Sequence, residues 1–383
     1  MEHPFLFISI NFVTLGKQKN NPMKRITLTL LLLLTTAVVF AAEPLRYVDA
    51  TSLTVLGKAL PTDKDYNRID LTKYAVPSDC VAYSGYSTGL HIVFTTDSKT
   101  IAARWTTSDR IPGTNMTPNT QKGLDLYIMR NGEWVFAGVG APKISGTRDT
   151  HEHTIVTNMA EGEKLCLLYL PIFDSVEKLE IGVEQGSNIA ATENPFRHKI
   201  IVHGSSITHG ASSSRAGMTY PAIFSRRTGL YTCNLGYSGR CKLQPEFATF
   251  LSEVADADAF VFDTFSNPSA EVIVENFDRF VDIIREKHPT TPLIFTQTIR
   301  RDTRNFNLKT EDFEAKKQAA AERVVRERMK RDKHIYFLDS EQWLGDDNLA
   351  TSDGIHPTDL GFMRMLDHME PAIQKILKKY GIK

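Results

Sequence analysis

The chain lacks several features that mark common protein classes. Its 383 residues carry 45 basic and 45 acidic side chains, so no positive excess points to nucleic-acid binding. It has only four cysteines, and none stands in a Cys-x-x-Cys pair, which argues against a structural zinc site or a thioredoxin-type redox centre. No internal repeat or low-complexity stretch is present. With 42% hydrophobic residues, the composition is that of a globular protein large enough for two domains.

The few cysteines leave their oxidation state open. Four cysteines allow three pairings, and the sequence does not choose among them. Buried free thiols are an equally good interpretation. The residues concerned are Cys80, Cys166, Cys233 and Cys241.

The first 42 residues have the pattern of an export signal. Lys24 and Arg25 precede an uncharged apolar run, Ile26–Phe40, and Val39–Ala41 is a small-x-small cleavage pattern. The run is shorter than the roughly 20 residues that span a bilayer. We therefore predict a signal peptide over residues 1–42, with translation starting at Met23. The mature protein is expected in the periplasm or outside the cell, without a stable membrane span.

Residues 43–195 have the pattern of an all-β domain. Short apolar runs with partial alternation are separated by turn signals such as Asn131-Gly132. Short strands at this spacing predict an antiparallel β-sandwich. The expected strands are Leu90–Phe94, Leu124–Ile128, Trp134–Ala137, Leu165–Leu170 and Leu179–Val183.

Residues 196–383 instead alternate between buried-type strands and helices. This order predicts a three-layer, flavodoxin-like α/β domain with a parallel five-stranded sheet. The expected strands are Ile200–Val202, Tyr231–Leu235, Ala259–Phe262, Leu293–Thr296 and Ile335–Leu338. The expected helices are Thr219–Arg227, Pro245–Val254, Ala270–Lys287, Glu311–Lys330 and Thr358–Lys379.

Chemically useful side chains gather at the carboxyl ends of these strands, where ligands bind in parallel α/β sheets. Ser206 stands where the first strand turns into a helix, and a serine hydroxyl needs a positioned base to act as a nucleophile. His356 is the candidate base. Asp353 lies three residues before it, close enough on one turn to fix the imidazole tautomer.

Acyl transfer also needs donors for an oxyanion. The candidates are the backbone N–H groups of Ser206 and Gly239 and the side-chain amide of Asn267. His209, Tyr237 and Arg300 are further candidates for substrate contact. This chemistry requires no metal or other cofactor.

These loops resemble the four blocks of the SGNH, or Gly-Asp-Ser-Leu-type, hydrolases. Gly204–Ile207 (GSSI) is similar to the first block, Gly239 and Asn267 to the second and third, and Asp353–Pro357 (DGIHP) to the last. The resemblance covers roughly residues 199–383. It departs at Ser205, where the family usually has Asp, and in the third block, usually Gly-x-Asn-Asp.

The front half resembles one bacterial branch of the same family. Gly123–Tyr127 (GLDLY) is similar to the Gly-x-Asp-Leu-Tyr signature of a β-domain that precedes these hydrolases. The resemblance implies an exported carbohydrate- or ester-directed enzyme. Export and a β-sandwich beside the catalytic domain together suggest a serine esterase that removes short acyl groups, above all acetyl, from carbohydrates. Two alternatives stay open: a lipid or thioester acyl hydrolase, and a glycan-binding protein with a degenerate hydrolase domain.

Two local patterns compete with this assignment. Gly85–Gly89 (GYSTG) matches the nucleophile elbow of α/β-hydrolases, but a β-type run follows where that elbow requires a helix. His203 and His209 lie near Ser206, but neither has a carboxylate three residues away. We expect His203 to be a packed core residue and prefer His356 as the base.

Overall fold

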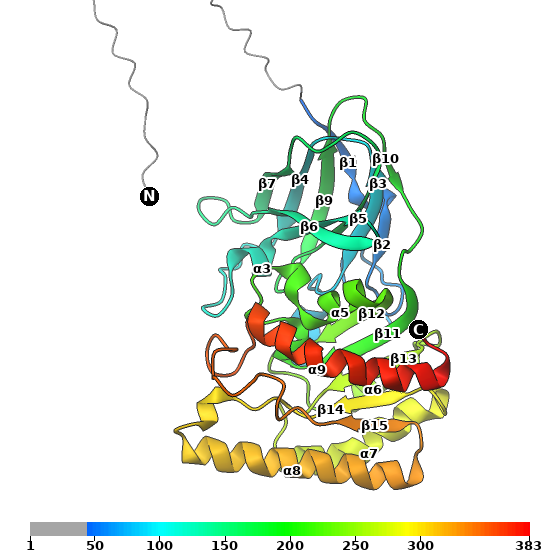
Figure 1. Cartoon of the computed structure of the whole chain (residues 1–383), viewed down its shortest axis with the longest axis vertical. Coiled ribbons are helices and arrows are strands. Elements are labelled where there is room, and N and C mark those ends of the chain that lie inside the picture. Colours follow the sequence, from blue (N-terminus) through cyan, green and yellow to red (C-terminus); the bar gives the residue numbers. More distant parts are fainter. Residues whose placement is uncertain (1–43) are drawn as a thin grey trace, which may run out of the picture. The chain divides into compact units, whose positions relative to one another are not determined.

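A computed structural model of the chain describes residues 44–383, which form one compact body (Figure 1). The predicted signal peptide and the proposed start at Met23 lie outside the described residues. Within residues 44–383, the structure contains no helix with the length and apolar character needed to cross a membrane.

The element order separates a β-rich front part from an α/β rear part. The strands of the front part are β1 (Arg46–Asp49), β2 (Thr54–Leu56), β3 (His91–Thr96), β4 (Ile101–Thr107), β5 (Leu124–Arg130), β6 (Glu133–Gly140), β7 (Thr150–Val156), β8 (Lys164–Tyr169), β9 (Val176–Val183) and β10 (Ile189–Ala191). Its α-helices are α2 (Val81–Ser84) and α3 (Pro118–Lys122). The rear strands are β11 (Arg197–Gly204), β12 (Leu230–Gly236), β13 (Ala259–Asp263), β14 (Leu293–Thr296) and β15 (Ile335–Leu338). The rear helices are α4 (Ser206–His209), α5 (Tyr220–Thr228), α6 (Pro245–Ser252), α7 (Ala270–Lys287), α8 (Leu308–Arg331) and α9 (Asp359–Leu377).

The front part is a sandwich of two antiparallel sheets, as predicted. Sheet A has the order β1-β9-β4-β7, and sheet B has the order β10-β3-β8-β5-β6, with β2 beside β3. Their inner faces share an apolar core that includes Trp105, Leu179 and Phe94. The sequence analysis missed β4 and β7 because their outward positions are polar or charged: Arg104 in β4 and Glu152 in β7 face solvent and form an ion pair.

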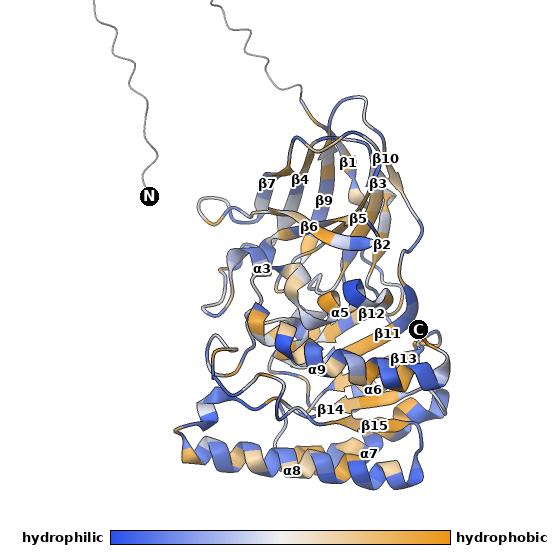
Figure 2. Cartoon of the chain, in the orientation of Figure 1, coloured by the Kyte–Doolittle hydropathy of each residue, from blue (hydrophilic) through white to orange (hydrophobic). Residues whose placement is uncertain are grey.

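The rear part is a three-layer α/β structure around sheet C, a parallel sheet with the order β12-β11-β13-β14-β15 (Figure 1). Alternate residues of β11 point to opposite faces of sheet C. Ile200 packs with α5 and α9, while Ile201 packs with α6, α7 and α8. Both faces are covered, so the central strands are apolar throughout, and Figure 2 shows them as orange arrows. This arrangement confirms the predicted fold of residues 196–383.

Helix α7 illustrates how the sequence fixes a helix boundary near the candidate site. Ser269 accepts a hydrogen bond from the backbone N–H of Val272, which caps the helix two residues after Asn267. Buried residues then recur at helical spacing and hold α7 against sheet C. These residues are Ile273, Phe277, Phe280, Val281 and Ile284.

One apolar cluster spans the two parts. Residues of sheet B, among them Val93 and Leu167, belong to the same buried cluster as Ile201 and Phe247 of the rear part. This continuity explains why residues 44–383 form a single compact unit. The division into domains at residues 195 and 196 therefore stays a prediction about folding units, although sheet C begins just after it.

A buried polar contact also joins the two parts, and it uses the Gly-x-Asp-Leu-Tyr segment. The carboxylate of Asp125, which is 0% exposed, accepts from Arg215 Nε at 3.1 Å and from the backbone N–H of Gly217 at 2.8 Å. Burial raises the pKa of Asp125 to about 6, against the opposing effects of Arg215 and Gly217. Nearby, the Arg226 guanidinium lies 3.9 Å from the ring centre of Tyr127.

We predict that Asp125→Ala lowers the free energy of unfolding by about 3 to 5 kcal/mol, because it leaves the Arg215 charge and the Gly217 N–H without their buried acceptor. Urea denaturation at pH 7 measures the change. Glu193→Ala, at an exposed position, is the control and should stay within about 0.5 kcal/mol of the parent. A loss for Asp125→Ala no larger than that of the control would contradict the role of this contact.

Candidate active site

Ser206 lies at the carboxyl edge of sheet C, at the start of α4. Strand β11 ends at Gly204, where a Cβ atom would lie 2.8 Å from the backbone oxygen of Asp263, so this position needs glycine. Ser205 caps α4 by accepting from the backbone N–H of Ile207. Ser206 is the first helical residue, so its own N–H has no acceptor inside the helix. Ser206 is largely buried, with 6% of the residue exposed.

The usual aspartate before the nucleophile is replaced by an arrangement that spans two strands. Ser205 Oγ donates to Asp263 Oδ2 at 2.8 Å, and Thr208 Oγ1 donates to the same oxygen at 3.0 Å. Burial raises the pKa of Asp263 to about 6, although these hydrogen bonds oppose the shift. A carboxyl group from the end of β13 thus supports the nucleophile loop where the family has one at position 205.

The structure brings the three predicted catalytic residues together. His356 Nε2 lies 2.8 Å from Ser206 Oγ, and His356 Nδ1 lies 2.7 Å from Asp353 Oδ2. These two distances give the order nucleophile, base and orienting carboxylate. The base and the carboxylate share one short turn, in which Asp353 Oδ1 accepts the backbone N–H groups of Ile355 and His356.

Asp353 is ionised over the whole neutral and mildly acidic range. Partial burial by itself would raise its pKa, but hydrogen bonds from the side chain and backbone of His356 outweigh burial and lower the pKa to about 2. A permanent negative charge at this position stabilises the imidazolium that forms when His356 takes a proton.

The predicted oxyanion donors come from the two strands that flank β11. Gly239 follows β12 and has a φ of 72°, a left-handed conformation that favours glycine. Asn267 follows β13, and its Oδ1 accepts from the backbone N–H of Cys241 at 3.3 Å. That bond joins the two loops and leaves the Asn267 Nδ2 group as the donor on the other side of the amide. The structure therefore places both loops beside Ser206, while the oxyanion role of each group stays a prediction.

A buried charged cluster supports the Asn267 loop, and the sequence analysis did not find it. Arg301 donates to the backbone oxygen of Ser266 at 2.6 Å, and Lys317 donates to the same oxygen at 3.2 Å. Glu314 pairs with both cations, at 2.9 Å from Arg301 and 2.6 Å from Lys317. The cluster fixes the peptide immediately before Asn267. Lys317 and Glu314 lie in α8, whose charged sequence resembles a solvated helix surface.

Two of the three predicted substrate-contact residues are buried. His209 is 0% exposed, stacks on Phe173 at 3.8 Å, and bonds through Nε2 to the backbone oxygen of Ile172 at 2.6 Å. Burial holds its pKa well below the usual value, so the ring is neutral. Tyr237 is also 0% exposed, with its hydroxyl 3.1 Å from Ser84 Oγ. Both side chains brace loops around the site, which corrects the expectation that they contact substrate.

Arg300 differs from these two residues because it is partly exposed. Its guanidinium donates to Asn305 Oδ1 at 2.8 Å. This bond keeps the side chain within the loop that precedes α8. Substrate contact by Arg300 stays a prediction.

The competing patterns have structural roles. Ser87, the central residue of the Gly-x-Ser-x-Gly match, is fully buried and donates to the backbone oxygen of Tyr66 in a turn that leads into β3. His203 is a core residue, as predicted, and bonds to the backbone oxygen of Leu235 at 2.9 Å. All four cysteines are buried free thiols.

Two pockets touch the segment 108–117, which connects β4 to α3: one is lined by residues at its start and the other by residues at its end. The larger has a volume of about 730 Å³, and the smaller, of about 530 Å³, reaches Asp353. The larger pocket presents tyrosine rings, carboxylates and one arginine: Asp63, Asp65, Tyr66, Tyr86, Arg110 and Glu177 are among its lining residues. Across residues 44–383, no cluster of three or more His, Cys, Asp or Glu side chains is arranged to hold a metal ion.

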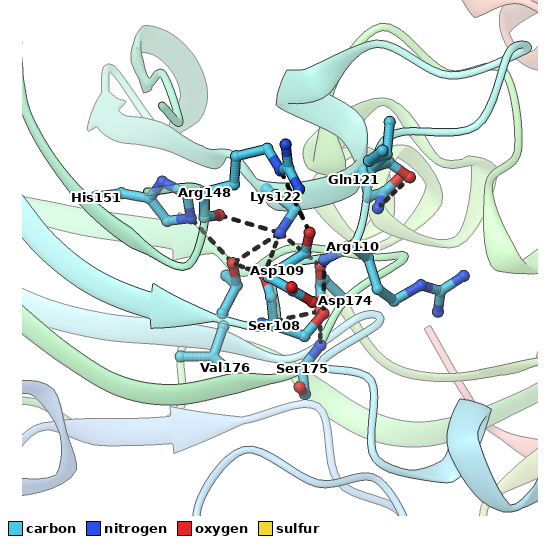
Figure 3. A network of polar contacts seen from close by, with 12 residues as sticks. Ser108, Asp109, Arg110, Gln121, Lys122, Arg148, His151, Asp174, Ser175 and Val176 are labelled. Atoms are coloured by element: carbon cyan, nitrogen blue, oxygen red, sulfur yellow. Dashed lines mark hydrogen bonds and ion pairs between the residues drawn. The ribbon is translucent and has the colours of Figure 1, made fainter. Parts of the chain in front are cut away.

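A buried ion pair, shown in Figure 3, includes Asp174, which lines the larger pocket together with Ser108. Lys122 Nζ lies 3.1 Å from Asp174 Oδ2, and both side chains are at most 1% exposed. Asp174 Oδ1 in turn accepts from Ser108 Oγ at 2.7 Å. The network fixes the start of the segment 108–117, so this wall of the pocket is rigid at its base.

The segment 108–117 also supplies a residue that the sequence analysis did not single out. Asn115 Nδ2 donates to Asp353 Oδ2 at 3.1 Å, although the two residues are 238 positions apart. No local sequence pattern around Asn115 predicts this contact, because the contact depends on how the front part packs against the rear part.

Comparison with known proteins agrees with this geometry. The sequence model of the GDSL-like lipase/acylhydrolase family matches residues 197–374, and the model for the N-terminus of SGNH-hydrolase-type esterases, named GxDLY, matches residues 45–189. No curated protein matches the chain.

Three of the similar solved structures each cover 88% of the chain. A GDSL-like lipase from Bacteroides ovatus is 46% identical, covers 88% of this chain and 98% of its own, and superposes with a TM-score of 0.84. The salicylyl-acyltransferase SsfX3 from a tetracycline biosynthetic pathway is 23% identical, with coverages of 88% and 99% and a TM-score of 0.67. A family two carbohydrate esterase from Cellvibrio japonicus is 15% identical, with coverages of 88% and 98% and a TM-score of 0.56.

The two more distant structures establish the fold, whereas the Bacteroides relative is similar enough over its full length to establish the family. The expected resemblance is thereby confirmed for both halves of the chain. The protein belongs to the GDSL-like, or SGNH, acylhydrolase family, in the branch with a Gly-x-Asp-Leu-Tyr β-region, and is an ester-bond hydrolase.

Proposed function

We propose that the protein is a serine esterase that removes short acyl groups, chiefly acetyl, from carbohydrates through an acyl-enzyme on Ser206. The observation that carries the serine mechanism is the pair of contacts of His356, at 2.8 Å to Ser206 Oγ and 2.7 Å to Asp353 Oδ2. A hydroxyl, an imidazole and an ionised carboxylate in this order are the groups that nucleophilic acyl transfer requires.

The reaction proceeds in two halves. His356 Nε2 takes the Ser206 proton as Oγ bonds to the ester carbonyl carbon, and the resulting oxyanion is held by N–H groups of Ser206, Gly239 and Asn267. The intermediate collapses, the C–O bond to the alcohol breaks, and His356 returns the proton to the leaving alcohol. Water then attacks the acyl-enzyme with His356 again acting as base, which releases the carboxylic acid and restores Ser206.

Two observations support a carbohydrate as the alcohol part of the ester. The chain shares its fold with family two carbohydrate esterases, one of which, from Clostridium thermocellum, has a structure in complex with cellohexaose. The pocket of about 730 Å³, which is not lined by Ser206, Asp353 or His356, offers carboxylates and an arginine that can bond to sugar hydroxyl groups. The Tyr86 ring in this pocket lies 6.1 Å from the His209 ring of α4, the helix that begins with Ser206.

The two alternative functions make different demands on the site. A lipid or thioester hydrolase would need room for a long acyl chain, and a degenerate glycan-binding protein would lack nucleophilic activity at Ser206. The intact contacts of Ser206 and His356 favour an active enzyme over the degenerate form. Chain-length preference then separates the acetyl esterase from the lipid hydrolase.

Ser206→Ala should reduce kcat/KM for p-nitrophenyl acetate by at least about 10³-fold, because no other group can form the acyl-enzyme. Ser87→Ala, which changes the central serine of the competing motif, is the matched control and should remain active. The two variants need equal thermal stability for the comparison. Residual activity in Ser206→Ala equal to that of the parent would rule out the mechanism.

The substrate proposal predicts fast release of acetate from acetylated xylo- or cello-oligosaccharides by the protein without its first 42 residues. The rate on p-nitrophenyl esters should fall steeply from acetate to octanoate if the enzyme acts on short acyl groups as proposed. Enzymatic measurement of released acetate and a chain-length series of esters test both points. A preference for octanoate would favour the lipid hydrolase instead.

We also propose that the protein is exported and acts in the periplasm or outside the cell, on the basis of the signal pattern in residues 1–42. Export predicts that the mature protein begins close to Glu43 and is recovered from the periplasmic or extracellular fraction. N-terminal sequencing of the fractionated native protein decides this. Recovery of an intact chain from the cytoplasm would overturn the proposal.

A further inference from the structure

Asn115 belongs to the β-rich front part but contacts the catalytic pair of the rear part. It lies in the segment between β4 and α3, and its Nδ2 donates to Asp353 Oδ2 at 3.1 Å. The same nitrogen lies 3.3 Å from His356 Nδ1. Since His356 Nδ1 itself donates its proton to Asp353, the amide makes its hydrogen bond with the carboxylate and only packs against the imidazole.

With Asn115 in place, the acceptor positions of Asp353 are filled. Oδ1 accepts backbone N–H groups from Ile355 at 3.0 Å and His356 at 2.8 Å. Oδ2 accepts from His356 Nδ1 at 2.7 Å and from Asn115. Three of these donors come from the same turn as the carboxylate, and the fourth comes from the front part. The Asp353 side chain is 33% exposed, so without Asn115 water would take the fourth position.

Hydrogen bonds also connect the backbone of Asn115 to the turn that carries Asp353 and His356. Ser212 Oγ donates to the backbone oxygen of Asn115 at 3.0 Å, and Ser352 Oγ donates to Ser212 Oγ at 2.6 Å. Ser212 has a φ of 70°, a strained value for a residue other than glycine. Ser352 closes the connection, since its backbone N–H donates to the backbone oxygen of His356 at 3.0 Å.

A second connection runs on the far side of the histidine. Thr117 Oγ1 donates to the backbone oxygen of Ser214 at 2.7 Å. Ser214 donates through its backbone N–H and its hydroxyl to the two carboxylate oxygens of Asp359, at 2.8 and 2.5 Å. Asp359 begins α9, three residues after His356. The segment 108–117 is therefore tied to the chain on both sides of the catalytic histidine.

We propose that Asn115 is a positioning residue for catalysis: its amide completes the hydrogen bonds of Asp353 and thereby fixes the carboxylate that orients His356. This inference rests on the proposed serine mechanism. The proposal means that the front part contributes a residue to the active site and does not only pack against the rear part. A carboxylate whose acceptors are all engaged has one orientation, so His356 keeps the tautomer and the direction that proton transfer from Ser206 requires.

Other ionisable groups near the pair are engaged elsewhere. Asp302 accepts from Thr351 Oγ1 at 2.6 Å, and Asp359 accepts from Ser214. The charge that His356 meets directly is that of Asp353. A change at position 115 therefore acts on the Asp353–His356 pair itself.

The test compares Asn115→Ala and Asn115→Asp with the parent on p-nitrophenyl acetate. Asn115→Ala should lower kcat about ten-fold with little change in KM, because the lost bond positions a catalytic group and does not bind substrate. Asn115→Asp keeps the shape but adds a negative charge beside the imidazole, which favours the protonated ring. The acid limb of its kcat/KM profile should move to higher pH by about one unit. A purely structural role would lower thermal stability but leave the kcat of the folded Asn115→Ala protein at the parental value.

Thr114→Ala is the matched control, because Thr114 is exposed, lies in the same segment and lines the same pocket. It should keep the kcat and pH profile of the parent. Should Asn115→Ala fail to fold, Asn115→Asp decides by its kcat on the pH-independent plateau, which should also fall because an ionised carboxylate cannot donate to Asp353. Parental kcat and an unmoved acid limb in the folded Asn115 variants would overturn the proposal. Labelling of Ser206 in the parent by a fluorophosphonate separates this outcome from failure of the serine mechanism, in which the parent itself would not be labelled.

Discussion

The buried carboxylate of Asp125 is the contact on which the relation between the two parts of the molecule depends. It accepts from Arg215 and from the backbone N–H of Gly217, both in the segment that follows the nucleophile helix. Because this carboxylate is fully buried, any other packing of the front part would leave charged and polar groups without partners. The Gly-x-Asp-Leu-Tyr signature therefore acts as an internal docking contact, and it lies at the start of the strand that the apolar pattern already predicts.

Docking matters because the catalytic loops are supported from both parts. The segment 211–218, held by Asp125 on one side, is joined through Ser214 to Asp359 at the start of α9. The segment 108–117, fixed at its base by the Lys122–Asp174 ion pair, places Asn115 beside Asp353. A shift between the two parts would therefore also change the surroundings of the Asp353–His356 pair. The front part is better described as a wall of the active site than as a separate module.

The nucleophile loop illustrates how one family position can be replaced. Where the family usually has aspartate before the nucleophile, this chain has Ser205, and the carboxyl group comes from Asp263 on the neighbouring strand. The hydroxyl of Ser205 bridges the helix start and that carboxyl group. The Arg301–Glu314–Lys317 cluster performs a similar task for the loop of Asn267. Both arrangements place buried charged groups against the loops that carry Ser206 and Asn267, where they hold the backbone of these loops.

The sequence by itself determined the order of elements in the rear part, since continuous apolar runs and helix caps are local patterns. It also determined Ser206, Asp353 and His356 as one set, because strand-end placement and the Asp-x-x-His spacing are written in the chain. It did not determine β4 and β7, whose outward faces carry charge, or the burial of His209 and Tyr237, which the packing of the front part imposes. Only the tertiary structure decided the contact of Asn115 with Asp353, the replacement of an aspartate by Ser205 and Asp263, and the support of Asn267 by α8. Each of these contacts joins residues far apart in the chain. A hydrogen bond between distant residues produces no repeating pattern in a single sequence, so the sequence alone does not predict it.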